Sequence, residues 1–239
     1  MRIFRLLLCS FLGLSLTPLF IGCNSDEIFD TGIQTHLVWR ENASNPYDET
    51  GMLFSRIYHD YKSIHSDSVY DINRIITEVE KIIEQSAIYS ELAGTYTPID
   101  PIIIRDVILN PDVSIDECIY QLDWDYTVQQ FGLLLYNILQ VNMSSDEVYA
   151  SLIEFETQIL QNSDLSMDVK EKLLSCCSIM RYDLDNGDDR DWNDQNGNII
   201  KAVLMGMKEN TSKAIVMAVV VQVFIRQQTE DKVPDEMSP

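Results

Sequence analysis

The hydrophobic residues between positions 48 and 228 recur at intervals of three and four, which is the spacing of one face of an α-helix. The segment 68–87 shows the pattern most clearly, and its stripe consists of Ile72, Ile75, Val79 and Ile82. The same spacing recurs in four further segments, at 48–64, 125–141, 144–160 and 166–182. The pattern predicts amphipathic helices that pack side by side.

Capping signals mark where several of these helices begin. Ser144 and Glu147 have the spacing of a capping box, and Ser166 is a natural N-cap residue. Asp100 followed by Pro101 predicts another start, because proline is favoured at the first helical position. The other start signals are Asp48, the pair Ser68 and Asp71, and the pair Ser114 and Glu117.

Two apolar segments have patterns that fit either a helix or a strand. Residues 214–225, AIVMAVVVQVFI, are apolar on every side and too few to cross a bilayer, which takes about 20 residues. They indicate a central core helix, although their valines would also suit a buried strand. Residues 101–109 have the same ambiguity, and we take them as a short helix. We therefore expect an all-α fold, a bundle of roughly six to eight helices.

The first residues have the order of a secretory signal peptide. Arg2 and Arg5 precede an apolar run, and the small residue Gly22 precedes Cys23. The run is shorter than a spanning helix and contains Pro18, so we interpret residues 1–22 as a removed signal.

The sequence LFIGC, at residues 19–23, resembles the lipobox of bacterial lipoproteins, with Phe20 where leucine is usual. The resemblance implies cleavage before Cys23 and its acylation by chains such as palmitate, which anchor stably once two are present. The alternative is an ordinary signal peptide with an incidental cysteine. The acidic residues in the following CNSDEIFD resemble the surface-export signal of Bacteroidetes lipoproteins, or they are a simple polar tether. We expect a protein at the outer membrane or cell surface, attached to the membrane through lipidated Cys23.

Two later segments resemble a group of uncharacterised Bacteroidetes lipoproteins. NPYDETG, at residues 45–51, is similar to the segment that opens the first helix of that group. LSMDVKEKLLSCCSIMRY, at residues 165–182, is similar to a second pattern of the group, and GNIIKAVLMG and KAIVMAVV also resemble it. The resemblance implies a helical fold and an envelope location, and no activity comes with it. The chain departs from the group just after Tyr182, where aspartates replace aromatic residues.

These signals divide the chain into four parts. The predicted parts are a signal peptide at 1–22, the lipidated cysteine and a tether at 23–47, a helical domain at 48–228 and a disordered tail at 229–239. The formal net charge of −21 arises from 17 basic and 38 acidic residues. Such a chain repels phosphate backbones, so we expect no nucleic-acid partner.

The aspartate-rich stretch at residues 181–198 is the most unusual part of the sequence. No register of it satisfies an EF-hand loop, which needs Gly at position 6 and Glu at position 12. Asp189, Asp191 and Asn193 are nevertheless a candidate calcium site, because calcium accepts flexible oxygen geometry. The alternative is a solvated connector between two helices, with turns at Gly187 and Gly197.

Other candidate chemistry is sparse. Trp124 between Asp123 and Asp125 is a candidate sugar-binding site, or an anchor at the start of a helix. The three histidines have no zinc-site spacing, and no nucleophile elbow or phosphate loop is present. The cysteines beyond the signal region are expected to fill the core as thiols, with their pairing left open, and they are Cys118, Cys176 and Cys177.

The leading hypothesis is a non-enzymatic binding or interaction module at the cell envelope, with an unknown protein or extracellular ligand as partner. A second hypothesis is a small-molecule or glycan-processing protein that uses carboxylates in the bundle. A pocket joining acids from separate helices would favour the second. A third is a surface domain stabilised by calcium, and we expect no other cofactor.

Overall fold

The computed structural model of the protein describes residues 41–65, 71–109, 115–120, 125–140, 144–184 and 192–230. Within these ranges the secondary structure consists of ten α-helices and one 3-10 helix, with no strand. In chain order the elements are α2 (Glu49–Ile64), α3 (Ile72–Gln85), η1 (Ala87–Tyr89), α4 (Ser90–Thr95), α5 (Pro101–Leu109), α6 (Ile115–Tyr120), α7 (Tyr126–Gln140), α8 (Ser145–Gln161), α9 (Met167–Asp183), α10 (Trp192–Met207) and α11 (Thr211–Glu230). The all-α prediction is confirmed, and the helices are slightly more numerous than the expected six to eight.

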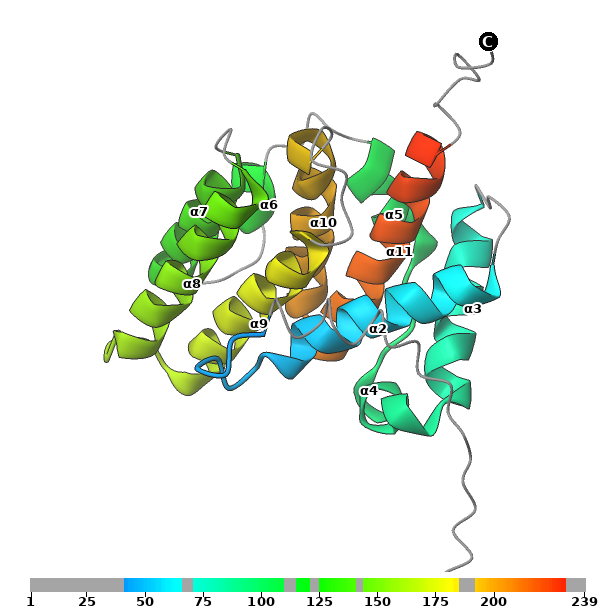
Figure 1. The fold of residues 1–239 in the computed structure, drawn as a ribbon, viewed down its shortest axis with the longest axis horizontal. Coiled ribbons are helices and arrows are strands. Elements are labelled where there is room, and N and C mark those ends of the chain that lie inside the picture. Colours follow the sequence, from blue (N-terminus) through cyan, green and yellow to red (C-terminus); the bar gives the residue numbers. More distant parts are fainter. Residues whose placement is uncertain are drawn as a thin grey trace, which may run out of the picture.

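α11 is the central helix of the bundle. It packs against α10, α2, α3 and α5, and it also touches α4 and α9. Every side chain from Lys213 to Gln227 is buried, so residues 214–225 form the predicted core helix and not a strand. α7 and α8 lie on one side of this centre and α3 and α4 on the other, while α2 runs across α9 and α11 (Figure 1).

The apolar sequence after residue 198 forms two helices because the chain turns tightly between α10 and α11. A Cβ atom on Gly206 would lie 2.3 Å from the Cα of Ala214, so this close approach requires glycine. The Asn210 side chain then accepts a hydrogen bond from the backbone N–H of Lys213 at 2.8 Å, which starts α11.

η1 and α4 add to the helix count without any matching prediction. Both are short, and a helix of one or two turns has no room for a recognisable stripe. They are held in place by tertiary packing, since Tyr89 and Leu92 are buried in the core.

Most of the predicted helix starts are observed. Ser144 and Glu147 form both hydrogen bonds of a capping box, and the Ser166 hydroxyl caps α9. Asp100 accepts a hydrogen bond from the first turn of α5. α3 begins at Ile72 with Asp71 as its N-cap, and Ser68, the other residue of that signal, lies outside the described residues.

None of the described helices is both long and apolar enough to cross a membrane. α11 continues to Glu230, so the helix includes the first two residues of the predicted tail.

Candidate functional site

A buried ionic network joins the start of α2 to α8 and α9. Arg181 of α9 donates a hydrogen bond from Nε to Glu156 Oε1 of α8 at 3.0 Å, and both side chains are fully shielded from solvent. The same guanidinium also binds the carboxylate of Asp48, which directly precedes α2. A buried charge is tolerated only when it is paired and hydrogen-bonded, and Arg181 meets both conditions.

The other donors to Glu156 come from the chain before α2. Asn42 Nδ2 donates to Glu156 Oε2 at 2.5 Å, and Asn45 Nδ2 donates to Oε1 at 2.8 Å. Asn45 also donates to the backbone carbonyl of Leu174 at 3.0 Å. Burial raises the pKa of the Glu156 carboxyl, while Arg181 and the two asparagines oppose that rise. The network thus fixes residues 42–48 against the body of the bundle.

The helices α2 and α9 approach so closely that a glycine is required between them. A Cβ atom on Gly51 would lie 2.4 Å from both the backbone oxygen of Ser178 and a ring carbon of Tyr182. Instead, the Gly51 N–H donates to Ser178 Oγ at 3.0 Å, and that hydroxyl donates to the Asp48 carbonyl at 2.8 Å. Tyr182 donates its hydroxyl proton to Asp48 Oδ2 at 3.1 Å.

Asp48 has a different role from the one that its sequence position suggests. It stands at the predicted N-cap of α2, yet its carboxylate forms no capping hydrogen bond. Arg181 and Tyr182 occupy that carboxylate instead. The helix-start prediction is correct in position and wrong in chemistry, because leaving the buried guanidinium of Arg181 unpaired would cost more free energy than leaving the helix uncapped. An arginine inside the apolar stripe of α9 was the one sequence signal for a buried carboxylate partner.

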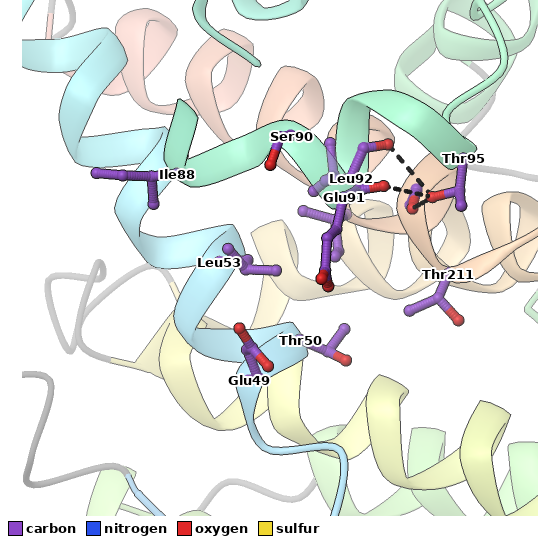
Figure 2. A pocket seen from close by; sticks show the side chains of 11 residues that line it. Glu49, Thr50, Leu53, Ile88, Ser90, Glu91, Leu92, Thr95 and Thr211 are labelled. Carbon is purple, nitrogen blue, oxygen red and sulfur yellow. Dashed lines mark hydrogen bonds between the residues drawn. The ribbon is translucent and has the colours of Figure 1, made fainter. Parts of the chain in front are cut away.

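An open cavity of about 470 Å³ lies beside this network, between α2, the η1–α4 segment and α11 (Figure 2). Its lining residues are Glu49, Thr50, Leu53, Ile88, Ser90, Glu91, Leu92, Thr95, Thr211, Ser212 and Ile215. Thr50, Leu92 and Ile215 are buried, whereas Glu49 and Glu91 are exposed. The cavity therefore has a mixed lining of apolar side chains and hydroxyl groups, with two exposed carboxylates.

Hydroxyl groups bridge two walls of the cavity. Thr95 Oγ1 of α4 lies 2.5 Å from Ser212 Oγ of α11, within hydrogen-bonding distance. Figure 2 shows the Glu91 side chain extending from α4 toward α2, where Glu49 lies. Within the described part of the chain, neither of these carboxylates has an ion pair or a hydrogen bond. Their capacity to accept hydrogen bonds is free for a ligand.

The network and the cavity share the first turn of α2. Asp48 and Gly51 contact α9, whereas Glu49 and Thr50 line the cavity. The Thr50 hydroxyl also lies 3.3 Å from Ser175 Oγ of α9. The buried network therefore holds one wall of the cavity in position, as a supporting layer holds the residues of a binding site.

The aspartate-rich stretch begins inside the core and not in a solvated connector. α9 continues through Asp183, whose side chain is fully buried. Among the described residues, neither Asp183 carboxylate oxygen has a hydrogen-bond partner. Burial raises the pKa of this carboxyl to about 7, and the charge of Arg226 on α11 only partly opposes the rise. The connector interpretation is wrong for residues 181–184 and for Gly197, which lies within α10 and makes no turn. Packing against the core overrides the weak helix propensity of these residues.

Most of the candidate site residues lie outside the described residues. These are Cys23, Asp123, Trp124, Asp189 and Asp191, together with the side chain of Asn193, whose backbone belongs to α10. The calcium site and the lipidated cysteine remain predictions. In the described ranges, no group of three or more acidic, histidine or cysteine side chains is placed to hold a metal ion.

Asp125 has a structural role at the start of α7. Its carboxylate accepts a hydrogen bond from the backbone N–H of Val128 at 3.0 Å, which caps the helix. This contact fits the helix-start interpretation of the segment around Trp124. The sugar-binding interpretation stays a prediction, because the other two residues lie outside the described ranges.

Cys176 and Cys177 are free thiols in the core, as expected. Burial raises the pKa of Cys176 to about 12 and also raises that of Cys177. A thiol that stays protonated is a poor nucleophile and a poor metal ligand, so both residues serve packing. The side chain of Cys118 lies outside the described residues.

No protein-family model, no curated protein and no solved structure matches this chain. The candidate site therefore rests on the geometry of the network and the cavity alone.

Proposed function

We propose that the protein is an exported binding module, held at the cell envelope through lipidated Cys23, and that its ligand site is the cavity between α2, α4 and α11. The observation that carries the proposal is the cavity itself, which gathers side chains from three parts of the chain that are far apart in sequence. Its volume falls in the range of small-molecule sites, and its lining combines apolar side chains with hydroxyl and carboxylate groups.

Two features make the cavity suitable for recognition. The first turn of α2 is held against α9 by the Asp48–Arg181 contact. The positions of Glu49 and Thr50 therefore do not depend on a ligand. The wall formed by α4 is tied to α11 through Thr95 and Ser212. A preformed site loses little conformational entropy on binding, which favours affinity.

A cavity-filling variant tests this proposal. The mature protein would be screened against small metabolites by ligand-observed NMR, in parallel with Ser90→Trp and Ser63→Trp. Ser90 lines the cavity, whereas Ser63 is an exposed serine of α2 outside it. Binding of a ligand that occupies the cavity should be lost in Ser90→Trp and retained in Ser63→Trp. Finding no ligand with this pattern would contradict the proposal.

The two rim carboxylates favour a second candidate function. Glu49 and Glu91 come from separate helices and line one cavity, and glycan hydrolysis uses a pair of carboxylates in one site. Release of reducing sugar from oligosaccharides by the wild type, lost in both Glu49→Gln and Glu91→Gln, would support hydrolysis. Equal release by these variants would exclude it.

A further inference from the structure

We infer that the ligand of this cavity is a small aliphatic amine, bound with an ammonium group at Glu49 and Glu91 and with its carbon chain against the apolar side chains of the lining. This inference rests on the proposed binding function and adds the chemical class of the ligand.

The charged residues that line the cavity are both acidic. Two carboxylates that have no partner among the described residues lie on its rim, and the lysines, arginines and histidines of the described ranges are not part of its lining. A negative potential at the cavity attracts cations and repels carboxylates and phosphates. The formal net charge of −21 reinforces this preference at longer range.

The polar groups that line the cavity can all accept hydrogen bonds. An ammonium group has three donors and no acceptor, so it needs only acceptors around it. Carboxylates supply acceptors alone, and the hydroxyl groups of Ser90 and Thr211 on the cavity wall can each supply one more. Charge-assisted bonds of this kind are stronger than bonds between neutral groups.

The apolar surface distinguishes an organic cation from a metal ion. Leu53, Leu92 and Ile215 supply apolar surface to the lining, and Ile88, which also lines the cavity, is 46% exposed. A metal ion gains nothing from such surface, because divalent cations of the calcium type bind oxygen ligands only. A hydrocarbon chain gains about 25 cal/mol for each Å² that it removes from water.

Three compounds of equal length and different charge test the inference. They are 1,5-diaminopentane, its neutral counterpart 1,5-pentanediol and its anionic counterpart glutarate, and calcium chloride serves as the inorganic cation. Binding to the mature protein is measured by calorimetry and by NMR shifts of backbone amides in α2, α4 and α11. We expect saturable binding of the diamine alone, abolished by Ser90→Trp and weakened by raised salt.

Charge-removing variants provide the quantitative test. Glu49→Gln and Glu91→Gln should each raise the dissociation constant of the diamine about tenfold, which is the effect of losing one charge-assisted bond. Glu154→Gln is the matched control, since Glu154 is an exposed glutamate of α8 outside the cavity, and it should leave binding unchanged.

The possible outcomes separate the two proposals. If the diol or glutarate binds in the cavity and the diamine does not, the inference is overturned and the binding function stands. If calcium alone binds and depends on Glu49 and Glu91, the site is for an inorganic cation and the inference is again overturned. If neither these compounds nor the screened metabolites bind with sensitivity to Ser90→Trp, both proposals fall.

Discussion

Arg181 Nε lies 3.0 Å from Glu156 Oε1, and both side chains are completely buried between α8 and α9. The two residues are 25 positions apart, yet together they hold the chain before α2 in place through Asn45 and Asp48. A buried pair of this kind is costly to break, because removing one partner leaves the other charge unpaired in a medium of low dielectric constant.

Replacing Arg181 by methionine should therefore destabilise the protein by about 3–5 kcal/mol. The measurement is the free energy of unfolding from urea titration. Lys172→Met is the control on the same helix, since Lys172 and Asp168 form an ion pair 2.9 Å long that is exposed to solvent. Exposed pairs contribute at most about 1 kcal/mol, so the control should change stability little. Equal losses for the two variants would contradict a buried ionic network.

Gly51→Ala should destabilise the protein by about 1–3 kcal/mol or more, because the new methyl group collides with Ser178 and Tyr182 across the contact of α2 with α9. Gly94→Ala on α4 is the matched control, since a Cβ atom there meets nothing within 4 Å. Alanine favours the helix over glycine by up to about 1 kcal/mol, so Gly94→Ala should be neutral or stabilising. Thermal unfolding should show a lower midpoint for Gly51→Ala and an unchanged or higher midpoint for Gly94→Ala.

Asp183 should make the stability of the protein depend on pH. Burial raises the pKa of its carboxyl from 3.8 to about 7, so the folded protein holds this proton more tightly than the unfolded chain does. The resulting stability is fully present below about pH 3.8 and is lost as the pH rises through 7. The loss between these limits is on the order of 4 kcal/mol.

The comparison that isolates this effect is wild type against Asp183→Asn at several pH values. The difference in the free energy of unfolding should grow in favour of the variant as the pH rises from 4 to 8. Asp164→Asn is the matched control for the removal of one carboxylate, since it changes an exposed aspartate. A flat difference for Asp183→Asn would show that this carboxyl keeps the same pKa in the folded and unfolded states.

Cys23→Ala should abolish acylation and release the protein from membranes or block its processing. Fractionation of cells followed by immunoblotting measures the distribution, and labelling with a palmitate analogue measures acylation. Cys9→Ala, within the predicted signal peptide, is the control and should leave both unchanged. Membrane retention of Cys23→Ala at the wild-type level would refute the lipoprotein prediction.

The long amphipathic helices of this protein follow from local sequence. The stripe of Ile72, Ile75 and Val79 is buried as its spacing predicts, and the capping box at Ser144 forms as its residues require. Both features depend on residues within a few positions of one another, where the geometry of a helix fixes which side chains meet.

The candidate site depends on contacts that no local pattern encodes. Asp48 meets Arg181 across 133 positions, and the cavity forms only when α2, α4 and α11 converge. Asp183 belongs by composition to an acidic stretch, yet the packing of α9 buries it. The sequence alone determined the long amphipathic helices, because their spacing and caps depend on neighbouring residues, whereas η1 and α4 depend on tertiary packing. Only the tertiary structure decided which charged side chains are buried together and which face the cavity, because those contacts depend on how the helices pack.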